Sequence, residues 1–183
     1  IIPDLVIVTH PFGIPITKNF SEKLKEKNKN LKIIFDCSHT QGVKIEDKYL
    51  NEYADITFFS IQGTKAISGG EGGLILTNNE KYYNRMIDLS HPGRPNNNLI
   101  NSFAGLSIST KFRMHPLAAI IAHSSLNNLE NNNLNIAKKF KNIYSLLNSN
   151  DLFEIPKINY SELGGFHHGL PFFIMDKTEK IQN

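Results

Sequence analysis

Short apolar runs, each bounded by polar or turn-forming residues, predict the strands of this chain. Leu5 to Thr9 is a continuous apolar run, which is typical of a strand buried on both faces of a sheet. Leu31 to Phe35 predicts a second buried strand that ends at Asp36. Asp55 to Ser60 and Gly72 to Thr77 predict a third and a fourth strand.

Helical patterns separate and follow these strands. Ser21 to Asn28 has polar helical character, Glu46 to Tyr53 predicts a short helix or turn, and Glu80 to Leu89 predicts a helix that starts after the capping-type pair Asn78-Asn79. From Pro116 to about Ser149 apolar residues recur at three- and four-residue steps. Because asparagine is a poor helix former, the Asn-rich middle of this region predicts a kink or two separate helices.

Strands that alternate with helices predict an α/β fold, with a mostly parallel sheet and helices on both of its faces. Ligands of such sheets bind at the carboxyl ends of the strands. Asp36 and Ser60 both fall at a strand's carboxyl end. This edge of the sheet is therefore the expected position of a functional site.

The composition excludes several classes of protein. The chain has 183 residues, 40% of them hydrophobic and 20% charged, and a net charge of +3, which is typical of an ordinary soluble globular protein. The basic residues are scattered, with no basic stripe interleaved with aromatics, so no nucleic-acid partner is expected. No apolar run approaches a membrane span and no signal peptide is visible. One cysteine, Cys37, permits no internal disulfide, which fits a cytoplasmic location.

The segment from Phe35 to Thr77 carries the most specific pattern. It reads F-D-C-S-H-T-Q-G and later D-I-T-F-F-S-I-Q-G-T-K-A-I-S-G-G-E-G-G-L-I-L-T. An aspartate at a strand end, then S-x-x-x-x-K, then E-G-G, in this order and spacing, resembles the DegT-type (DegT/DnrJ-like) sugar aminotransferases, fold-type-I enzymes that use pyridoxal 5'-phosphate (PLP). V-T-H-P-F-G-I-P-I and T-K-F-R-M-H-P-L-A-A also resemble family motifs. The likeness covers most of the chain and is loose after Asp151.

The resemblance implies a domain plan. Residues 1–115 would form part of the PLP-binding large domain, residues 116–150 a long connecting helix region, and residues 151–183 the beginning of a small C-terminal domain. The chain does not begin with Met, opens inside an apolar run and ends without a finishing element. We therefore expect a fragment, which would be inactive by itself.

The resemblance also implies the two central residues of the site. Lys65 would hold PLP as an internal aldimine. A lysine between Gly63 and Gly69, just after a buried strand, is unlike a lysine on a surface helix. Asp36 would keep the pyridine nitrogen of the cofactor protonated. The alternative for Asp36 is a strand-terminal aspartate that caps the next turn.

Further cofactor contacts follow from position in the family motifs. Ser38 stands where the family has a small residue against the ring face, and His39 stands at the His/Gln position near the phenolic oxygen, although it could be structural. Ser60 and Gln62 match the phosphate-side residues, and a hydroxyl suits a phosphate dianion. Lys111 stands near a family asparagine that reaches the phosphate of the neighbouring subunit's cofactor, where a lysine can serve as a point charge.

Other candidates carry weaker signals. Arg113 could hold a carboxylate, brace a dimer or be structural. The adjacent His167-His168 would point to opposite faces of a strand, and no third ligand is evident, so no metal site is expected and a loop role near the substrate is the alternative. Glu71, among its glycines, is expected to be structural, and Cys37 is expected to be a small buried residue.

The resemblance therefore implies a PLP-dependent aminotransferase that acts on a keto-sugar or keto-cyclitol, with glutamate or glutamine as donor. It implies a homodimer with a shared active site and a role in nucleotide-sugar, amino-sugar or polysaccharide biosynthesis. The alternatives are another fold-type-I PLP reaction, such as an elimination or a desulfurase-like step, and a non-catalytic regulatory relative. Lys65 argues against the dehydrating branch, in which a histidine replaces the lysine. A Rossmann-type dehydrogenase lacks support because no G-x-G-x-x-G opens a helix.

Overall fold

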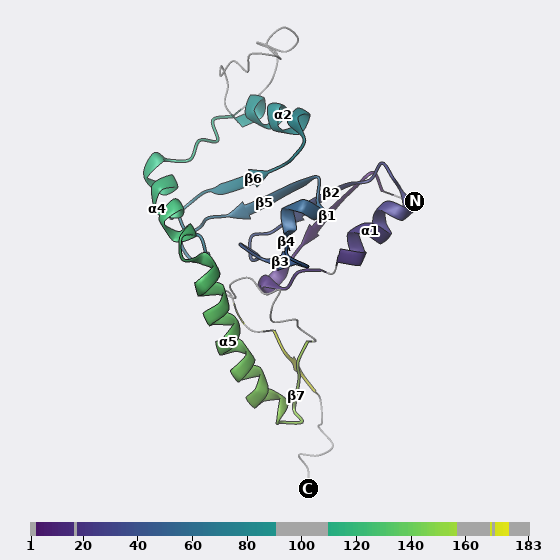
Figure 1. Ribbon diagram of the computed structural model, residues 1–183, viewed down its shortest axis with the longest axis vertical. Helices are drawn as coiled ribbons and strands as arrows, with labels where there is room; N and C mark the ends of the chain where they lie inside the picture. The colour runs from purple at the N-terminus through teal and green to yellow at the C-terminus, as the bar shows by residue number, and fades with distance from the viewer. Residues whose placement is uncertain (1–2, 17, 91–109, 157–168, 170, 176–183) are drawn as a thin grey trace.

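A four-stranded sheet forms the centre of the computed structural model, which describes residues 3–16, 18–90, 110–156, 169 and 171–175. The strands lie in the order β1 (Leu5–Thr9), β2 (Lys32–Asp36), β5 (Ile56–Ser60) and β6 (Gly73–Leu76) (Figure 1). The first three run parallel, and β6 runs antiparallel to β5. The four predicted strands and the mostly parallel sheet are thus confirmed.

The predicted helices are also present. They are α1 (Lys18–Lys27), α2 (Glu80–Ser90), α4 (Pro116–Leu126) and α5 (Leu129–Asn148), with a short 3-10 turn η1 (Pro11–Gly13) after β1. The Asn-rich stretch divides the long helical region at Asn127 and Asn128, as predicted. Within the described residues, none of the helices combines the length and apolar content that crossing a bilayer requires.

The segment predicted as a short helix or turn has a more detailed structure. It forms a hairpin of β3 (Lys44–Ile45) and β4 (Lys48–Tyr49), followed by the 3-10 helix η2 (Leu50–Tyr53). Glu46 and Asp47 join the two strands with φ of 48° and 65°. A two-residue hairpin of type I′ requires positive φ at both turn residues, which the apolar pattern alone does not reveal.

The C-terminal elements lie beside α5. β7 (Phe153–Glu154) and β8 (Phe173–Ile174) pair antiparallel and lie near the end of that helix (Figure 1). The Tyr144 hydroxyl donates to the Pro171 carbonyl at 2.9 Å. These contacts attach the C-terminal strands to α5.

The main hydrophobic core lies on one face of the sheet. Its buried residues are Val8, Leu31, Ile33, Phe35, Cys37, Val43, Ile45 and Leu50, with Leu24 of α1 and Tyr53 of η2 packed against them. Burial raises the pKa of the Cys37 thiol to about 12, so this residue carries no thiolate at neutral pH. The expectation that Cys37 is a small buried residue is confirmed.

The face of β1 that points away from this core is exposed, although the sequence predicts that it is buried. Leu5 and Ile7 are 49% and 60% exposed, so the prediction that this strand is buried on both faces is wrong for the described residues. Strand side chains alternate between the faces, and of the residues in β1 only Val6 and Val8 point toward the core.

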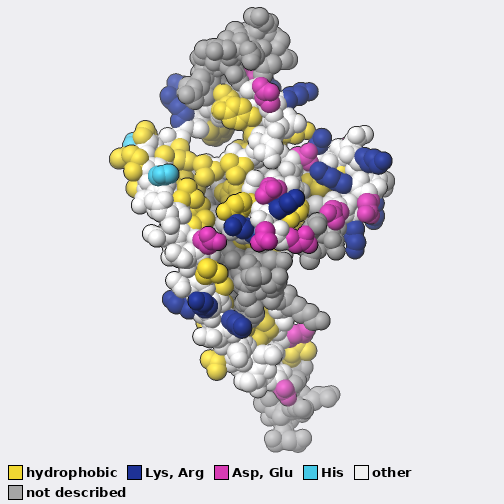
Figure 2. Space-filling view, in the orientation of Figure 1, with side chains coloured by type: hydrophobic (Ala, Val, Ile, Leu, Met, Phe, Trp, Pro, Cys, Tyr) yellow, Lys and Arg dark blue, Asp and Glu magenta, His cyan; other side chains and the backbone are white. Residues whose placement is uncertain are grey.

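Exposed apolar side chains also gather over α4 (Figure 2). Leu117, Ile120 and Ile121 lie on the surface there, and no other described element buries them.

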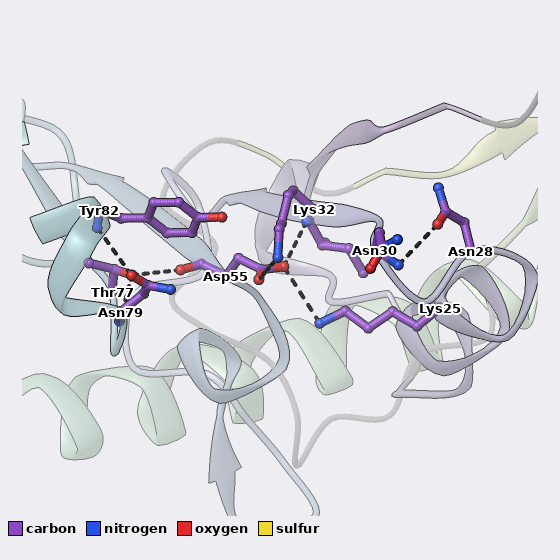
Figure 3. A network of polar contacts seen from close by, with 9 residues as sticks. Lys25, Asn28, Asn30, Lys32, Asp55, Thr77, Asn79 and Tyr82 are labelled. Atoms are coloured by element: carbon purple, nitrogen blue, oxygen red, sulfur yellow. Dashed lines mark hydrogen bonds and ion pairs between the residues drawn. The ribbon is translucent and has the colours of Figure 1, made fainter. Parts of the chain in front are cut away.

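A polar network fixes the amino-terminal edge of the sheet (Figure 3). Asp55 Oδ2 accepts from Ile33 N at 3.0 Å, and its carboxylate pairs with Lys25 at 3.5 Å and Lys32 at 3.6 Å. The Thr77 hydroxyl donates to the Asp55 carbonyl at 2.7 Å. Asp55 therefore ties α1, β2, β5 and the end of β6 together.

The same network starts α2. Asn79 N donates to Thr77 Oγ1 at 3.1 Å, and Asn79 Oδ1 accepts from Tyr82 N at 3.2 Å. This second bond satisfies a backbone donor in the first turn of the helix, as an N-cap does. The predicted cap of α2 is thus confirmed at Asn79.

Candidate functional site

Three strand ends bring the predicted site residues to one edge of the sheet. Thr9 of β1 pairs with Asp36 of β2, and Asp36 pairs with Phe58 of β5, two residues before Ser60. Because these strands are parallel, their carboxyl ends share an edge, opposite to the edge that Asp55 fixes. Asp36, Ser60 and the loops that follow them are therefore neighbours.

Asp36 ends β2 and shapes the turn after it. Its Oδ1 accepts from Ser38 N at 3.0 Å, and its carbonyl accepts from His10 N at 3.1 Å. The turn-capping alternative for Asp36 is thus realised. It occupies one carboxylate oxygen of a half-buried side chain, which is compatible with a ligand at the second oxygen.

His39 lies within electrostatic reach of both Asp36 and Lys65. Burial lowers the pKa of His39 below its ordinary value, the positive charge of Lys65 lowers it further, and the Asp36 carboxylate opposes both. His39 Nδ1 accepts from Phe12 N at 3.2 Å. A neutral imidazole that accepts through Nδ1 carries its proton on Nε2, so His39 can donate one hydrogen bond through that atom.

Lys65 sits in a loop whose shape depends on Ser60 and Gln62. Lys65 N donates to the Gln62 carbonyl at 2.9 Å and closes a turn. Gln62 Oε1 accepts from Thr64 N at 3.0 Å and from Thr64 Oγ1 at 2.7 Å, and Ser60 Oγ accepts from Gln62 N at 3.3 Å. The side chains of Ser60 and Gln62 therefore support the turn that presents the half-buried Lys65.

The glycines after Lys65 let the loop fold back against Ile61 and α4. Ile61 N donates to the Gly72 carbonyl at 3.0 Å, and Gly69 N donates to the Ile61 carbonyl at 2.8 Å. Gly70 has φ of +87°, and a Cβ added there would meet nothing within 4 Å. Gly69 is different, because a Cβ there would lie 2.7 Å from the Ala118 carbonyl oxygen of α4. Glu71, between Gly70 and Gly72, is exposed.

We expect Gly69→Ala to lower the free energy of unfolding by about 1–3 kcal/mol, because the added methyl collides with the backbone of α4. Gly63→Ala is the matched control in the same loop, since its added Cβ would lie 3.7 Å from the nearest contact, the Gly70 carbonyl oxygen. A compatible Gly→Ala change is neutral or stabilises by up to about 1 kcal/mol. Urea unfolding of both variants measures the difference, and equal effects would contradict the close packing of the loop on α4.

Lys111 and Arg113 belong to a different segment of the chain than Asp36, His39 and Lys65. Lys111 and Arg113 are exposed in the extended segment before α4, where Phe112 N donates to the Ser90 carbonyl at the end of α2 at 3.1 Å. Neither the hydrogen bonds of Asp36 nor the charges that shift the pKa of His39 involve Lys111. His167-His168 lies outside the described residues. Among the residues described, no three His, Cys, Asp or Glu side chains gather as metal ligands would.

Two buried polar residues at this edge were missed by sequence reasoning. Gln41 is 2% exposed and bonds to the Lys65 loop. His10 is 1% exposed, its Nδ1 accepts from Ile16 N at 3.2 Å, and its ring packs edge-to-face on Phe35 at 4.6 Å between centroids. Both stand inside the quoted motifs, as the last polar residue of F-D-C-S-H-T-Q-G and the histidine of V-T-H-P-F-G-I-P-I. Their position there was the available signal.

His10 predicts a pH dependence of stability. Burial lowers its pKa from 6.5 to about 4, against the opposing effect of the Asp36 carboxylate. Since the unfolded chain takes up this proton first, the contribution of His10 is complete above pH 6.5 and is lost as the pH falls toward 4. We expect His10→Asn, whose Oδ1 can replace Nδ1 as acceptor, to reduce the loss of stability between pH 7 and 4.5 by about 2 kcal/mol.

Urea unfolding at the two pH values measures this effect, with His123→Asn on α4 as the control that removes an exposed histidine. If His10→Asn and the parent lose the same stability on acidification, the buried neutral state of His10 is contradicted.

The groups at this edge fit the cofactor that the resemblance implies. An amine, a carboxylate, a neutral imidazole and a hydroxyl come from Lys65, Asp36, His39 and Ser60, and two of these groups act electrostatically on a third. The open space around Gly70 lies in the same loop. Amine, carboxylate and phosphate-binding groups are the chemistry that PLP requires.

The chain is similar in sequence to known sugar and cyclitol aminotransferases. The model of the DegT/DnrJ/EryC1/StrS aminotransferase family matches residues 4–182. The GDP-perosamine synthase of Escherichia coli O157:H7 is 34% identical over 88 residues, which are 48% of this chain and 24% of that protein. The putative L-glutamine:3-amino-2,3-dideoxy-scyllo-inosose aminotransferase of Micromonospora echinospora is 31% identical over 65 residues, 36% of this chain and 16% of that protein.

A solved structure extends the likeness over nearly the whole chain. The E. coli GDP-4-keto-6-deoxy-D-mannose-3-dehydratase with bound hydrated PLP matches with a TM-score of 0.77 at 14% identity, covering 96% of this chain and 48% of that chain. At this identity the match concerns the fold, and it confirms the expected fold class. This chain spans less than half the length of the curated relatives that it matches.

Proposed function

This chain belongs to the DegT/DnrJ/EryC1/StrS aminotransferase family, and on that premise we propose that the full-length protein is a PLP-dependent aminotransferase acting on a keto-sugar or keto-cyclitol. The names of the two relatives, a perosamine synthase and a glutamine:inosose aminotransferase, support a sugar or cyclitol acceptor and a glutamine or glutamate donor. The observation that carries the proposal is that Asp36 and Ser60 end neighbouring parallel strands at one edge of the sheet, where the charges of Asp36 and Lys65 both act on His39.

Lys65 and Asp36 have the central roles. When bound, PLP supplies an electron sink that makes the hydrogen on the carbon bearing the amine acidic. The Lys65 amine would hold the cofactor covalently between turnovers and, once released, would move a proton to and from that carbon. The Asp36 carboxylate, whose Oδ1 accepts from Ser38 N, would hold the proton on the pyridine nitrogen.

The surrounding residues orient the ring and the phosphate. His39 would hydrogen-bond the phenolic oxygen as a neutral imidazole whose Nδ1 accepts from Phe12 N. Ser38 would lie against the ring face as a small residue. Ser60 and Gln62 serve the phosphate side, in addition to supporting the Lys65 turn.

The proposal includes a second subunit. In a homodimer with a shared active site, Lys111 would reach the phosphate of the partner's cofactor, which fits its exposed position. The exposed apolar side chains of α4 are compatible with burial in a larger assembly. The protein would act in the cytoplasm, in amino-sugar or polysaccharide biosynthesis.

The domain plan is part of the same proposal. Residues 1–115 belong to the PLP-binding large domain, and residues 116–150 form the connecting region that α4 and α5 occupy. Residues 151–183 begin the small domain, to which the pair of β7 and β8 would belong.

A visible absorption titration of the full-length protein with PLP tests the function. We expect a visible band of lysine-bound cofactor that saturates with PLP and bleaches when L-glutamate or L-glutamine is added. A band that ignores every amino donor would favour another PLP reaction or a regulatory relative. The absence of any band in a folded protein would contradict the proposal.

A further inference from the structure

We propose that Gln41 is a positioning residue that fixes the reach of Lys65 by holding both ends of its loop. Gln41 Oε1 accepts from Ile67 N at 2.7 Å, and Nε2 donates to the Ile67 carbonyl at 3.4 Å and to the Ser60 carbonyl. Ser60 is the last residue of β5, and Ile67 follows Lys65 by two positions. One carboxamide therefore holds the loop before and after the lysine.

The chemistry of these bonds requires a carboxamide. The two backbone carbonyls need a donor and the Ile67 amide needs an acceptor, and both must come from one uncharged group of the right length. Gln41 is 2% exposed, so water cannot replace these bonds without opening the loop. Ile67 is itself buried against Ile61 and Ala122, which leaves the loop little freedom beyond the Gln41 contact.

The backbone of Gln41 is held in turn by α5. Asn133 Nδ2 donates to the Gln41 carbonyl at 2.9 Å. The next residue, Gly42, has φ of +77°, and a Cβ there would lie 2.7 Å from Leu129 Cδ2. The turn after Asp36 is thus clamped between α5 and the Lys65 loop, and Gln41 spans the gap between them.

This inference rests on the proposed function, because a fixed reach of Lys65 matters only if its amine must meet a cofactor held by Asp36. Asp36 and Gln41 belong to one turn, five residues apart. The Gln41 side chain therefore sets the position of the lysine relative to the carboxylate. A residue with this task touches neither substrate nor cofactor.

The test compares Gln41→Met and Gln41→Glu in the full-length protein. Methionine keeps the length of the side chain and removes all three hydrogen bonds. Glutamate keeps the acceptor for Ile67 N but replaces the donor to the Ser60 and Ile67 carbonyls with an oxygen that repels them. Asp55→Asn is the control, because it removes ion pairs at the opposite edge of the sheet. Hydrogen–deuterium exchange of the protein without PLP reports on the loop whether or not the protein is an aminotransferase.

We expect the Ile67 amide to exchange on the order of tenfold faster in Gln41→Met than in the parent, since one hydrogen bond is worth about that factor. We expect no such change at this amide in Asp55→Asn. With PLP, the pH midpoint of the lysine-bound cofactor band should shift in both Gln41 variants and stay constant in the control.

Unchanged exchange at Ile67, or a rise spread evenly over the whole chain, would overturn the role of Gln41. A parent protein that forms no band with PLP would instead overturn the proposed function. The exchange of the Ile67 amide would still test whether Gln41 holds the loop.

Discussion

Replacing Lys65 with alanine is expected to abolish covalent attachment of PLP and to lower the rate of amino transfer by roughly 10⁴-fold or more, because in the proposed mechanism the same amine binds the cofactor and moves the proton. The variant should fold, since the half-buried Lys65 supports its loop through its backbone bond to Gln62. Absorption spectra with PLP and single-turnover rates with the amino donor measure the two effects.

The matched control for Lys65→Ala is Lys81→Ala, which removes an exposed lysine from α2. It should keep both the cofactor band and the rate. If Lys65→Ala retains a band of parental intensity, another lysine holds the cofactor and the assignment of Lys65 is wrong.

Replacing Asp36 with asparagine should lower the turnover number on the order of 10²-fold, because the proton on the pyridine nitrogen loses its carboxylate partner. The introduced side chain could still accept from Ser38 N through its amide oxygen, so the turn that Asp36 Oδ1 now caps should persist. The variant also removes the negative charge that raises the pKa of His39, so that imidazole should protonate at lower pH than in the parent. Steady-state kinetics and an NMR titration of His39 measure these two effects.

Asp55→Asn is the control for Asp36→Asn, because it changes a comparable aspartate at the opposite edge of the same sheet. It should lower stability through the lost ion pairs with Lys25 and Lys32 and leave the turnover number unchanged. If the two variants lose the same activity, the effect of Asp36 is structural.

Local sequence patterns were sufficient to predict the strands and most helices of this fold. The apolar run of β1, the break at Asn127-Asn128 and the cap at Asn79 each depend on residues adjacent in sequence. The exposure of Leu5 and Ile7 was not predictable in this way, because burial depends on which elements cover a face.

The residues of the candidate site also differ in how far their roles could be predicted from local sequence. Asp36 and Lys65 stand in short motifs with recognisable spacing, so they could be proposed as site residues from the sequence alone. Gln41 also stands inside a motif, but its role could not be predicted, because that role arises from bonds to Ser60 and Ile67, 19 and 26 residues away. Asn133, 92 residues from Gln41, acts at a still longer range. Sequence spacing carries no direct information on such contacts.

Lys65 is the residue that we propose to hold pyridoxal phosphate. The most direct measurement is borohydride reduction of the full-length protein with PLP, followed by peptide mass spectrometry. We expect the added mass of the reduced cofactor on the peptide that contains Lys65, with fragment ions that place it on that residue. Label on a different lysine, or no label in a protein shown to be folded, would contradict the claim.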